Sequence, residues 1–455
     1  MKSLFAFLLC FIFIFSNAQD STALQFSKNI TKASLEKHLK TLASDAYEGR
    51  GTGTHGQKKA AYYIKSHFEK LGLQPINPKD SAKYYQYFNF KSNPEETFPV
   101  HIKSLKKGHI FSILFYTNND FIMDEEAIEV VWAGHGFDYS DTDIKDKIAV
   151  VWLGTPSDSI QKKHEINDTK SGILKSIYIK NKIAKENGAK AVFFIHKDKE
   201  EFEFFSTRVN SMAKFNNKIK LLESPQNTFG NVFFTPKALP QIFGISKKKF
   251  NSIFEKGIDF QLNALINIHT EYNLQRNITE NVIGILPGTT KQDEFVIVCA
   301  HYDHLGKIGR NILNGADLGL LGSQTFTSNM VIPKKSIKSV VNIDMVGRGE
   351  FDEKNKFSIY IIGDSKSNKR NQKIADMSFP NVKLSYFYNS KNHVDRLYYR
   401  SDHYSFAKYD IPFIFFYTGI HRDYHRPSDE SDKINYKTMR LVAQLIFLNI
   451  WEASR

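Results

Sequence analysis

The chain has 455 residues, 41% of them hydrophobic, so it is long enough for two or three domains and apolar enough to bury a core. The net charge is +14, but the lysines are scattered and are not grouped with stacking aromatic residues as a nucleic-acid groove requires. No G-x-x-x-x-G-K-[ST] loop is present to hold phosphates. We therefore expect a solvated lysine-rich surface and no nucleic acid among the partners.

The first 18 residues are typical of a secretory signal peptide. Lys2 precedes an apolar run over residues 4–15, and the small residues 16–18 match a cleavage site. A run of about 12 residues is too short for a membrane anchor, which is the rival interpretation. We predict cleavage after Ala18, a secreted or periplasmic protein, and no membrane span. The mature chain then keeps only Cys299 and forms no internal disulfide.

Two helices and a strand are predicted before residue 95. The apolar residues at helical spacing are Leu35, Leu39 and Leu42 in the first helix, and Ala60, Ile64, Phe68 and Leu71 in the second. Gly72 is expected to end the second helix. The stretch LASDAYEGRGTGTHGQ between the helices predicts a polar, glycine-rich loop. YYQYFNF, which follows the second helix, has the composition of a strand.

The sequence pattern changes after about residue 95. Short β-type runs dominate it: HIFSILFY, AIEVVWAGHGF and KIAVVWLG. One helix, from Ser176 to Asn187, leads through Gly188 into the strand AKAVFFIH. We find no cluster of metal-ligand residues and no internal repeat there. We therefore predict that residues 95–275 form a β-rich domain inserted into a core that is made of residues 19–94 and 276–455.

Strands and helices alternate after about residue 278. The candidates for buried strands are NVIGIL, EFVIVCAHYD, SIKSVVNIDM, FSIYIIGD and IPFIFFYTG. Such continuous apolar strands are typical of a sheet that is covered on both faces. The last helix, near Tyr436 to Glu452, is expected to turn Met439, Val442, Ala443, Ile446 and Ile450 inward. The predicted fold class is α/β, with a three-layer α/β/α core around a mostly parallel or mixed sheet.

Metal-ligand residues recur at the downstream ends of these strands. His301 and Asp303 close one strand, Asp344 closes the next, and His425 follows the last. Ligands bind outside the carboxyl ends of strands in open α/β sheets, and Asp317 lies in a nearby glycine-containing loop. Each residue alone could be a turn, a cap or an ordinary loop residue. Their shared placement favours a zinc site, because zinc accepts imidazole nitrogen and carboxylate oxygen.

Four motifs carry a family resemblance. AHYDHLG, NGAD, VVNIDMVGR and DYHRPSDESDKI occur in the order found in the M28 zinc metallopeptidases, aminopeptidases with two zinc ions. The stretch LASDAYEGRGTGTHGQKKAAYYIKSHFEKLGL resembles the amino-terminal segment of that family. GFDYSDTDIKDKIAVVWLG and IAKENGAKAVFFIH in the insert resemble a protease-associated (PA) domain. The resemblance implies that His301, Asp317 and Asp344 hold one zinc, that Asp317 and His425 contact a second, and that Asp303 orients His301.

The resemblance also implies that a segment is missing after Asp317. In the family, a helix and a strand follow this aspartate, and the strand ends in a Glu-Glu pair that supplies the general base and a zinc ligand. Here LGLLGSQTF follows Asp317 directly, no glutamate lies between Asp317 and Asp344, and Glu350 does not match the motif. A parallel crossover also needs about a dozen residues. We therefore predict that one core helix and strand, roughly 30 to 40 residues, are deleted.

These observations predict an exported zinc-dependent metallopeptidase of aminopeptidase type, which hydrolyses peptides or proteins with metal-activated water. One zinc site is expected to remain, the second to be weak, and activity to be impaired because both glutamates are missing. The alternative is a catalytically inactive peptide-binding or scaffold protein derived from such a peptidase. A glutaminyl cyclase of the same fold would need the same missing glutamate, and a sequence error at the gap is a further alternative. The oligomeric state is left open.

Overall fold

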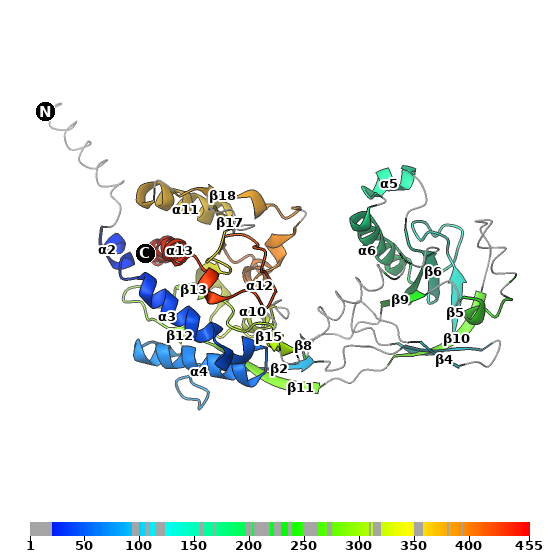
Figure 1. Cartoon of the computed structure of the whole chain (residues 1–455), viewed down its shortest axis with the longest axis horizontal. Coiled ribbons are helices and arrows are strands. Elements are labelled where there is room, and N and C mark those ends of the chain that lie inside the picture. Colours follow the sequence, from blue (N-terminus) through cyan, green and yellow to red (C-terminus); the bar gives the residue numbers. More distant parts are fainter. Residues whose placement is uncertain are drawn as a thin grey trace, which may run out of the picture. The chain divides into compact units, whose positions relative to one another are not determined.

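The chain divides into two compact units. The computed structural model describes residues 21–92, 100–105, 110–113, 123–154, 158–167, 169–196, 200, 203, 219–222, 229–234, 239–246, 248, 263–270, 275–308, 311–312, 320–349, 358–379, 382–393 and 395–455. The first unit consists of Met1–Asn89 and Ile278–Arg455, and the second of Phe90–Asn277 (Figure 1). The predicted signal peptide and Asp317 lie outside the described residues. The assignment of a PA domain stays a prediction.

The first unit begins with helices, as predicted. They are α2 (Ser21–Ser27), α3 (Lys32–Ala43), the 3-10 helix η1 (Asp45–Arg50) and α4 (His55–Lys70). Thr31 caps α3 by accepting a hydrogen bond from the backbone N–H of Ser34. Leu71, the last residue of the apolar spacing noted in the sequence, is 74% exposed. Leu71 follows the last helical residue, and Gly72 then turns the chain at a φ of +71°.

A mixed five-stranded sheet forms the centre of the first unit. Its order is β13 (Phe295–Cys299), β16 (Ile337–Ile343), β19 (Phe413–Tyr417), β17 (Ile359–Gly363) and β18 (Leu384–Ser385). β13, β16 and β19 run parallel, β17 is antiparallel to β19, and β18 is parallel to β17. The carboxyl ends of β13, β16 and β19 therefore meet at one edge, which is where the predicted metal ligands follow each strand.

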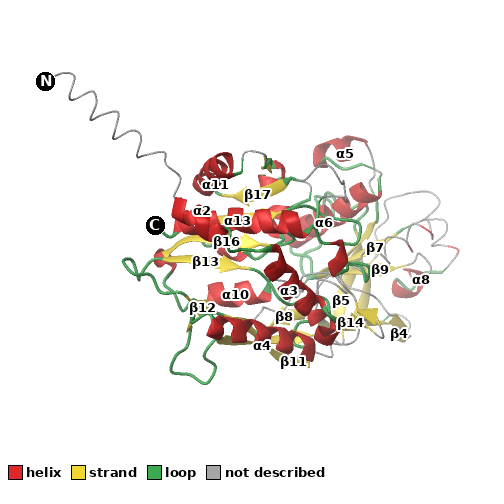
Figure 2. Cartoon of the chain, turned by 60° about the vertical axis from the view of Figure 1, so that its left-hand side comes forward, coloured by secondary structure: helices red, strands yellow, loops and turns green. Residues whose placement is uncertain are grey.

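Helices cover both faces of this sheet. They are α10 (Leu321–Ser328), α11 (Ser365–Ser378), α12 (His403–Ala407) and α13 (Tyr436–Ala453). Phe413 and Phe415 of β19 share one core with residues of α10 and α12. Ile414 and Phe416 share the other core with residues of α11 and α13. Figure 2 shows β13 and β16 between α13 and α10, so the predicted three-layer α/β/α arrangement is confirmed.

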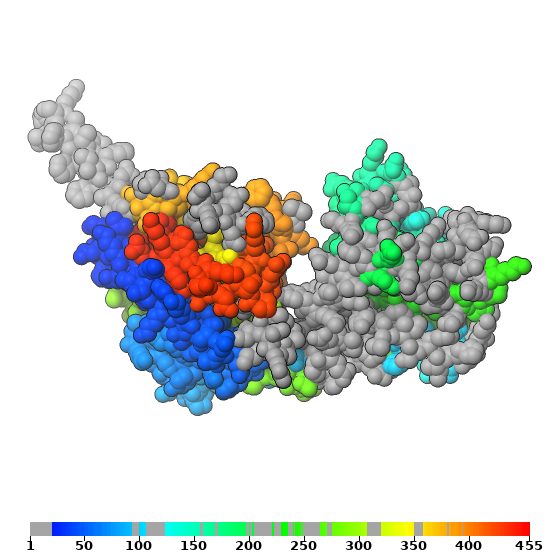
Figure 3. Space-filling model, viewed as in Figure 1, coloured from blue at the N-terminus to red at the C-terminus, as the bar shows by residue number. Residues whose placement is uncertain are grey.

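The two ends of the described chain pack together in the first unit. Phe26 of α2 stacks on Trp451 of α13, with ring centroids 5.8 Å apart. The side chain of Gln444 donates to the main-chain oxygen of Ser27 over 3.2 Å. In Figure 3 the blue amino-terminal helices lie beside the red carboxy-terminal segment. The last helix is thus buried on one side by the sheet and partly covered on the other by α2 and α3.

Two strand predictions for this sheet are wrong. No residue of β13 is fully buried, and Val298 is 48% exposed, whereas Val341, its register partner on β16, is 0% exposed. Within the described residues β13 pairs with β16 alone. NVIGIL does not join this sheet: β12 (Gly284–Ile285) pairs with β1 (Gln74–Pro75), and Leu286 is 80% exposed. An apolar run becomes buried only where neighbouring segments cover it.

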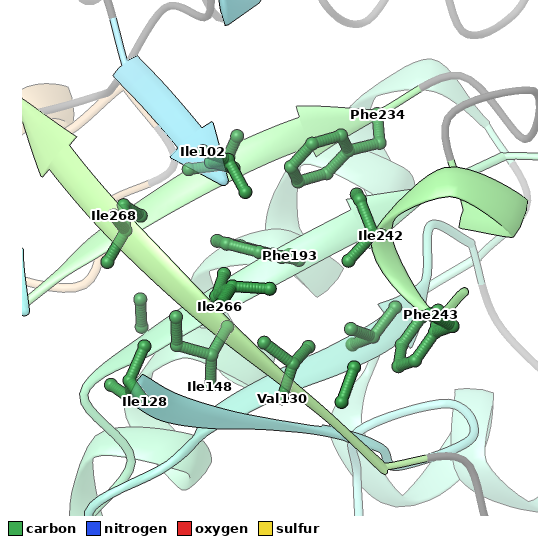
Figure 4. Packing of buried hydrophobic residues seen from close by; sticks show 14 of the residues in the cluster. Ile102, Ile128, Val130, Ile148, Phe193, Phe234, Ile242, Phe243, Ile266 and Ile268 are labelled. Carbon is green, nitrogen blue, oxygen red and sulfur yellow. The ribbon is translucent and has the colours of Figure 1, made fainter. Parts of the chain in front are cut away.

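The second unit is built on a seven-stranded sheet. Its order is β4 (Ile110–Ile113), β3 (Val100–Ser104), β10 (Asn263–Thr270), β5 (Asp124–Trp132), β6 (Ile148–Trp152), β7 (Ala191–Ile195) and β9 (Gly230–Phe234). The pairs from β4 to β5 are antiparallel, and those from β5 to β9 are parallel. Figure 4 shows the apolar cluster on one face, where Phe193 of β7 meets Ile266 of β10 and Ile148 of β6.

The helices that the structure describes in the second unit are α5 (Asp158–His164), α6 (Lys170–Glu186) and α8 (Leu239–Ile242). α6 begins six residues before the predicted start at Ser176, because Thr169 caps it by accepting from the N–H of Gly172. β8 (Ile219–Leu221) pairs with the end of β2 (Tyr85–Ser92), which is the predicted YYQYFNF strand.

The eight-residue strand β11 (Gln275–Val282) pairs with β2. The other elements that the structure describes are short: β14 (Lys307–Ile308), β15 (Asn311–Ile312) and the 3-10 helices η3 (Lys334–Ser336), η5 (Phe387–Asn389), η6 (Leu397–Tyr399) and η7 (Ser431–Lys433). None of the helices in the described ranges combines the length and the apolar character that a membrane crossing needs.

Candidate metal centre

His301 lies directly beyond the carboxyl end of β13, and its ring is held in one orientation. Its Nδ1 is 2.9 Å from the main-chain oxygen of Asp303. A carbonyl can only accept, so Nδ1 carries the proton of the neutral ring and Nε2 keeps its lone pair. Nε2 is 3.5 Å from Oδ1 of Asp344, which follows β16. The structure therefore brings two of the predicted ligands together, with the coordinating nitrogen turned toward the carboxylate.

Asp303 contributes in a different way from the one predicted. Its carboxylate Oδ1 is 3.8 Å from Nδ1 of His301, farther than its main-chain oxygen. The other carboxylate oxygen accepts a 2.6 Å hydrogen bond from the hydroxyl of Thr52. The main chain of Asp303 thus orients the histidine, and its side chain attaches the site to the amino-terminal segment. A carboxylate two residues on was the expected partner, but the backbone turn after His301 brings the carbonyl closer.

The predicted glycine-rich loop lies alongside the site. The side chain of Arg50 donates to the main-chain oxygen of Tyr302 over 2.9 Å, and the N–H of His304 donates to the main-chain oxygen of Arg50 over 2.8 Å. Gly51 faces Gly306 so closely that a Cβ on Gly51 would lie 2.9 Å from the Cα of Gly306. A larger residue would push the two segments apart, so glycine at this position keeps the residues after His301 in place.

Asp344 is mostly buried and held by two hydrogen bonds. Its backbone N–H donates to the main-chain oxygen of Phe416 over 3.3 Å, and the hydroxyl of Ser401 donates to Oδ2 over 3.0 Å. Burial alone would raise the pKa of Asp344, but the neighbouring His301 ring and the hydroxyl of Ser401 more than offset this and hold the pKa below its ordinary value. The carboxylate is therefore ionised at neutral pH, which is the form that binds a cation.

His425 lies in the loop after β19. Its backbone has a φ of +61°, and its ring stacks on Tyr424 with centroids 3.5 Å apart. The ring of His304 is 6.4 Å away, edge to face. Burial lowers the pKa of His425 to about 4 and that of His304 to about 3, so both rings are neutral at pH 7. Neutral imidazole is the form that coordinates a metal.

Zinc fits the His301–Asp344 pair. Two ligands about 2.0–2.2 Å from a tetrahedral zinc lie about 3.3–3.5 Å from each other, which agrees with the 3.5 Å between these two side chains. In the part of the chain that the structure describes, no three His, Cys, Asp or Glu side chains form a group that could hold a metal, so His425 does not join the pair. The predicted third ligand, Asp317, lies outside that part.

The sequence did not single out Thr52, Arg50 or Ser401 as site residues. The glycine density of EGRGTGT was the only signal for the first two, and nothing in the spacing pointed to Ser401. His403 has the surroundings of a structural residue: its Nε2 lies 2.9 Å from the main-chain oxygen of Tyr398, and its ring stacks on two phenylalanines of β19.

The chain is similar to known proteins in part of its sequence and in its fold. Residues 311–450 match the profile of peptidase family M28. The fold is similar to that of an aminopeptidase from Aneurinibacillus sp. strain AM-1, with 17% identity over 95% of this chain and 96% of that chain and a TM-score of 0.52. BSAP, a zinc aminopeptidase from Bacillus subtilis, has 17% identity over 92% of this chain and 95% of that chain, with a TM-score of 0.45. A search of curated protein sequences found no match.

The matched segment contains the sequence positions of Asp317, Asp344 and His425 and begins after His301. The likeness in fold rests on the Aneurinibacillus aminopeptidase, and the alignment covers nearly the whole of this chain. The fold likeness confirms the predicted fold class, and the profile match over residues 311–450 is to the family that the sequence motifs resemble.

Proposed function

We propose that this chain, a member of peptidase family M28, is a zinc-dependent peptidase of aminopeptidase type that acts on peptides or proteins. The observation that carries the proposal is the 3.5 Å approach of His301 Nε2 to Asp344 Oδ1 at the carboxyl ends of two adjacent parallel strands. The similarity in fold to an aminopeptidase supports the choice of substrate, and the imidazole and carboxylate of the pair support the choice of zinc.

The chain's own residues would hold and orient the cation. His301 would bind through Nε2 and Asp344 through Oδ1, with Asp317 as the third ligand and His425 beside a second, weaker position. The main-chain oxygen of Asp303 would hold the proton on Nδ1 of His301, which keeps the lone pair on Nε2. When bound, zinc supplies a Lewis acid that polarises a carbonyl and lowers the pKa of a water ligand to about 7.

We also propose that turnover is impaired. No glutamate lies between Asp317 and Asp344, so the pair that would supply the general base and a ligand is missing. A general base contributes about 10²–10⁴-fold to such reactions. The partly exposed edge of β13 supports the deletion of one core strand, because a further strand at that edge would cover it. The same absence supports the second candidate, a peptide-binding protein without catalysis.

The remaining features of the proposal come from the sequence. We assign a signal peptide to residues 1–18, and hence export, and a PA-type insert to residues 95–275 within a core of 19–94 and 276–455. The apolar run before Ala18 supports the signal peptide, and the short β-type runs of residues 95–275 support the insert.

A turnover assay tests the proposed function. The metal-free chain is incubated with one equivalent of zinc and an aminoacyl-p-nitroanilide, beside a His301→Ala variant and a control variant, His55→Ala, which removes an exposed histidine at the start of α4. We expect slow, zinc-dependent release that His301→Ala abolishes and His55→Ala leaves unchanged. Robust turnover would overturn the impairment, and peptide binding with no zinc-dependent turnover would favour the second candidate.

A further inference from the structure

A buried arginine joins the two segments that carry Asp344 and His425. Arg348 is only 7% exposed and follows Asp344 by four residues. One guanidinium nitrogen lies 2.9 Å from Oδ2 of Asp423, and another lies 3.1 Å from Oδ1 of Asp429. These two aspartates lie on either side of His425 in the sequence, so a single side chain holds both ends of the His425 loop.

Backbone hydrogen bonds hold the Arg348 segment in the same place. The hydroxyl of Thr418, just after β19, lies 2.6 Å from the main-chain oxygens of both Met345 and Arg348 and shares its one hydrogen between them. The N–H of Asn435, before α13, donates to the main-chain oxygen of Gly347 over 2.9 Å. The segment after Asp344 is therefore attached to both ends of the stretch that contains His425.

Other polar groups complete the cluster around the two aspartates. Lys433 lies 2.9 Å from Asp423, Ser428 donates to the same carboxylate, and His421 lies 3.7 Å from Asp429. The hydrogen bond from Ser428, with those from Lys433 and Arg348, lowers the pKa of Asp423 well below its ordinary range. The carboxylate is thus charged at neutral pH. Among these partners, Arg348 is the one that reaches both aspartates and is itself buried.

The backbone at the two candidate ligands needs such support. Met345, directly after Asp344, has a φ of +53°, and His425 has a φ of +61°. A non-glycine residue in this region is strained and persists only where its surroundings hold it. The contacts of Arg348, Thr418 and Asn435 provide this support. They fix the chain on both sides of Met345 and of His425.

We propose that Arg348 is a positioning residue: through Asp423 and Asp429 it fixes the His425 loop against the end of β16 and thereby sets the placement of the metal-binding side chains. The proposal rests on the proposed function in that Asp344 and His425 are taken as residues of the metal site. Arginine suits the role because its planar guanidinium reaches two carboxylates at once, which the single ammonium of lysine does not.

The test measures local exchange and metal affinity separately. Amide hydrogen exchange is recorded on the metal-free chain for residues 420–430, with α13 and β7 as internal references. Cobalt(II) affinity is measured by titration of the same samples. The variants are Arg348→Met, Arg348→Lys and, as a control, Arg440→Met, which removes an exposed arginine from α13 of the same unit.

We expect Arg348→Met to speed exchange in residues 420–430 about tenfold or more while β7 is unchanged, and to weaken cobalt binding about 10- to 100-fold. Arg348→Lys should give intermediate values, and Arg440→Met should match the parent chain. Unchanged exchange at 420–430 in both Arg348 variants would overturn the link itself. Faster exchange with unchanged cobalt affinity would overturn its role at the metal site. If the parent chain binds no cobalt, the proposed function fails, and the exchange result still decides whether Arg348 holds the loop.

Discussion

The two units each contain an apolar edge strand, and the two strands have different surroundings. β9 of the second unit, GNVFF, is fully buried along its length although only β7 pairs with it in the described residues. β13 of the first unit, FVIVC, has no fully buried residue although its composition is as apolar. Phe233 of β9 stacks on Phe194 of β7 with centroids 5.2 Å apart, whereas Val298 of β13 is half exposed.

Composition alone does not separate these strands, because both predict burial. What separates them is how completely the rest of the unit covers the edge. An uncovered apolar edge is a liability that proteins ordinarily protect with charges, a bulge or another segment. β13 bears no charged residue, so its sequence suits a strand with neighbours on both sides. This supports the proposal that a core strand next to β13 has been lost.

The largest expected effect concerns the residues that follow the edge strand β13 and its neighbour β16. We expect Asp344→Asn to reduce zinc affinity on the order of 100-fold, because Asn has no charge and the carboxylate would contact the cation. Asp303→Asn should reduce it less than about tenfold, because the main-chain oxygen of Asp303 holds His301 in both cases. Zinc affinity is measured by competition with a chelator. Equal losses of zinc affinity in the two variants would show that the Asp303 carboxylate contributes more to zinc binding than the geometry indicates.

The same substitution in each edge strand tests the comparison directly. Val232 of β9 is 0% exposed and Val298 is 48% exposed. Val232→Ala should lower the free energy of unfolding of the second unit by about 2 kcal/mol, since it leaves a cavity, while Val298→Ala should cost less than about 0.5 kcal/mol in the first unit. Val341→Ala serves as the buried reference on β16. Urea unfolding measures the free energy of unfolding of all three variants. A large loss of stability in Val298→Ala would mean that the edge of β13 is covered in solution.

The last expected effect is a pH dependence in the second unit, from a fully buried amine beside the end of β6. Lys180 donates to the main-chain oxygens of Trp152 and Gly154, and burial lowers its pKa from 10.5 to about 7. Unfolding therefore takes up a proton between about pH 7 and 10.5, and the free energy of unfolding rises with pH there, by up to about 1.4 kcal/mol per pH unit. Below about pH 7 this dependence disappears.

Lys180→Met should remove this dependence of the free energy of unfolding on pH. Trp132 and Trp152 report on the second unit, and Trp451 of the first unit can be replaced by Phe so that it does not contribute to the fluorescence. Urea unfolding at several pH values between 6 and 9 then compares the variant with its parent. An identical slope in both would mean that Lys180 keeps its proton in the folded chain.

Much of the first unit could be predicted because its signals are local. Strands β16, β17 and β19 are continuous apolar runs, and the positions of the candidate ligands after β13, β16 and β19 follow from sequence order alone. The pairing of His301 with Asp344 follows because the carboxyl ends of adjacent parallel strands meet. The roles of Thr52, Ser401 and Arg348 could not be predicted, since each depends on a contact between residues far apart in the chain. The exposure of β13 was missed for the same reason.

Anomalous diffraction at the zinc absorption edge, from crystals of the zinc-loaded chain, tests the central claim most directly. The account predicts a peak about 2.0–2.2 Å from both Nε2 of His301 and Oδ1 of Asp344. A zinc peak that touches neither side chain, or no peak in a chain whose two side chains keep their 3.5 Å approach, would contradict it.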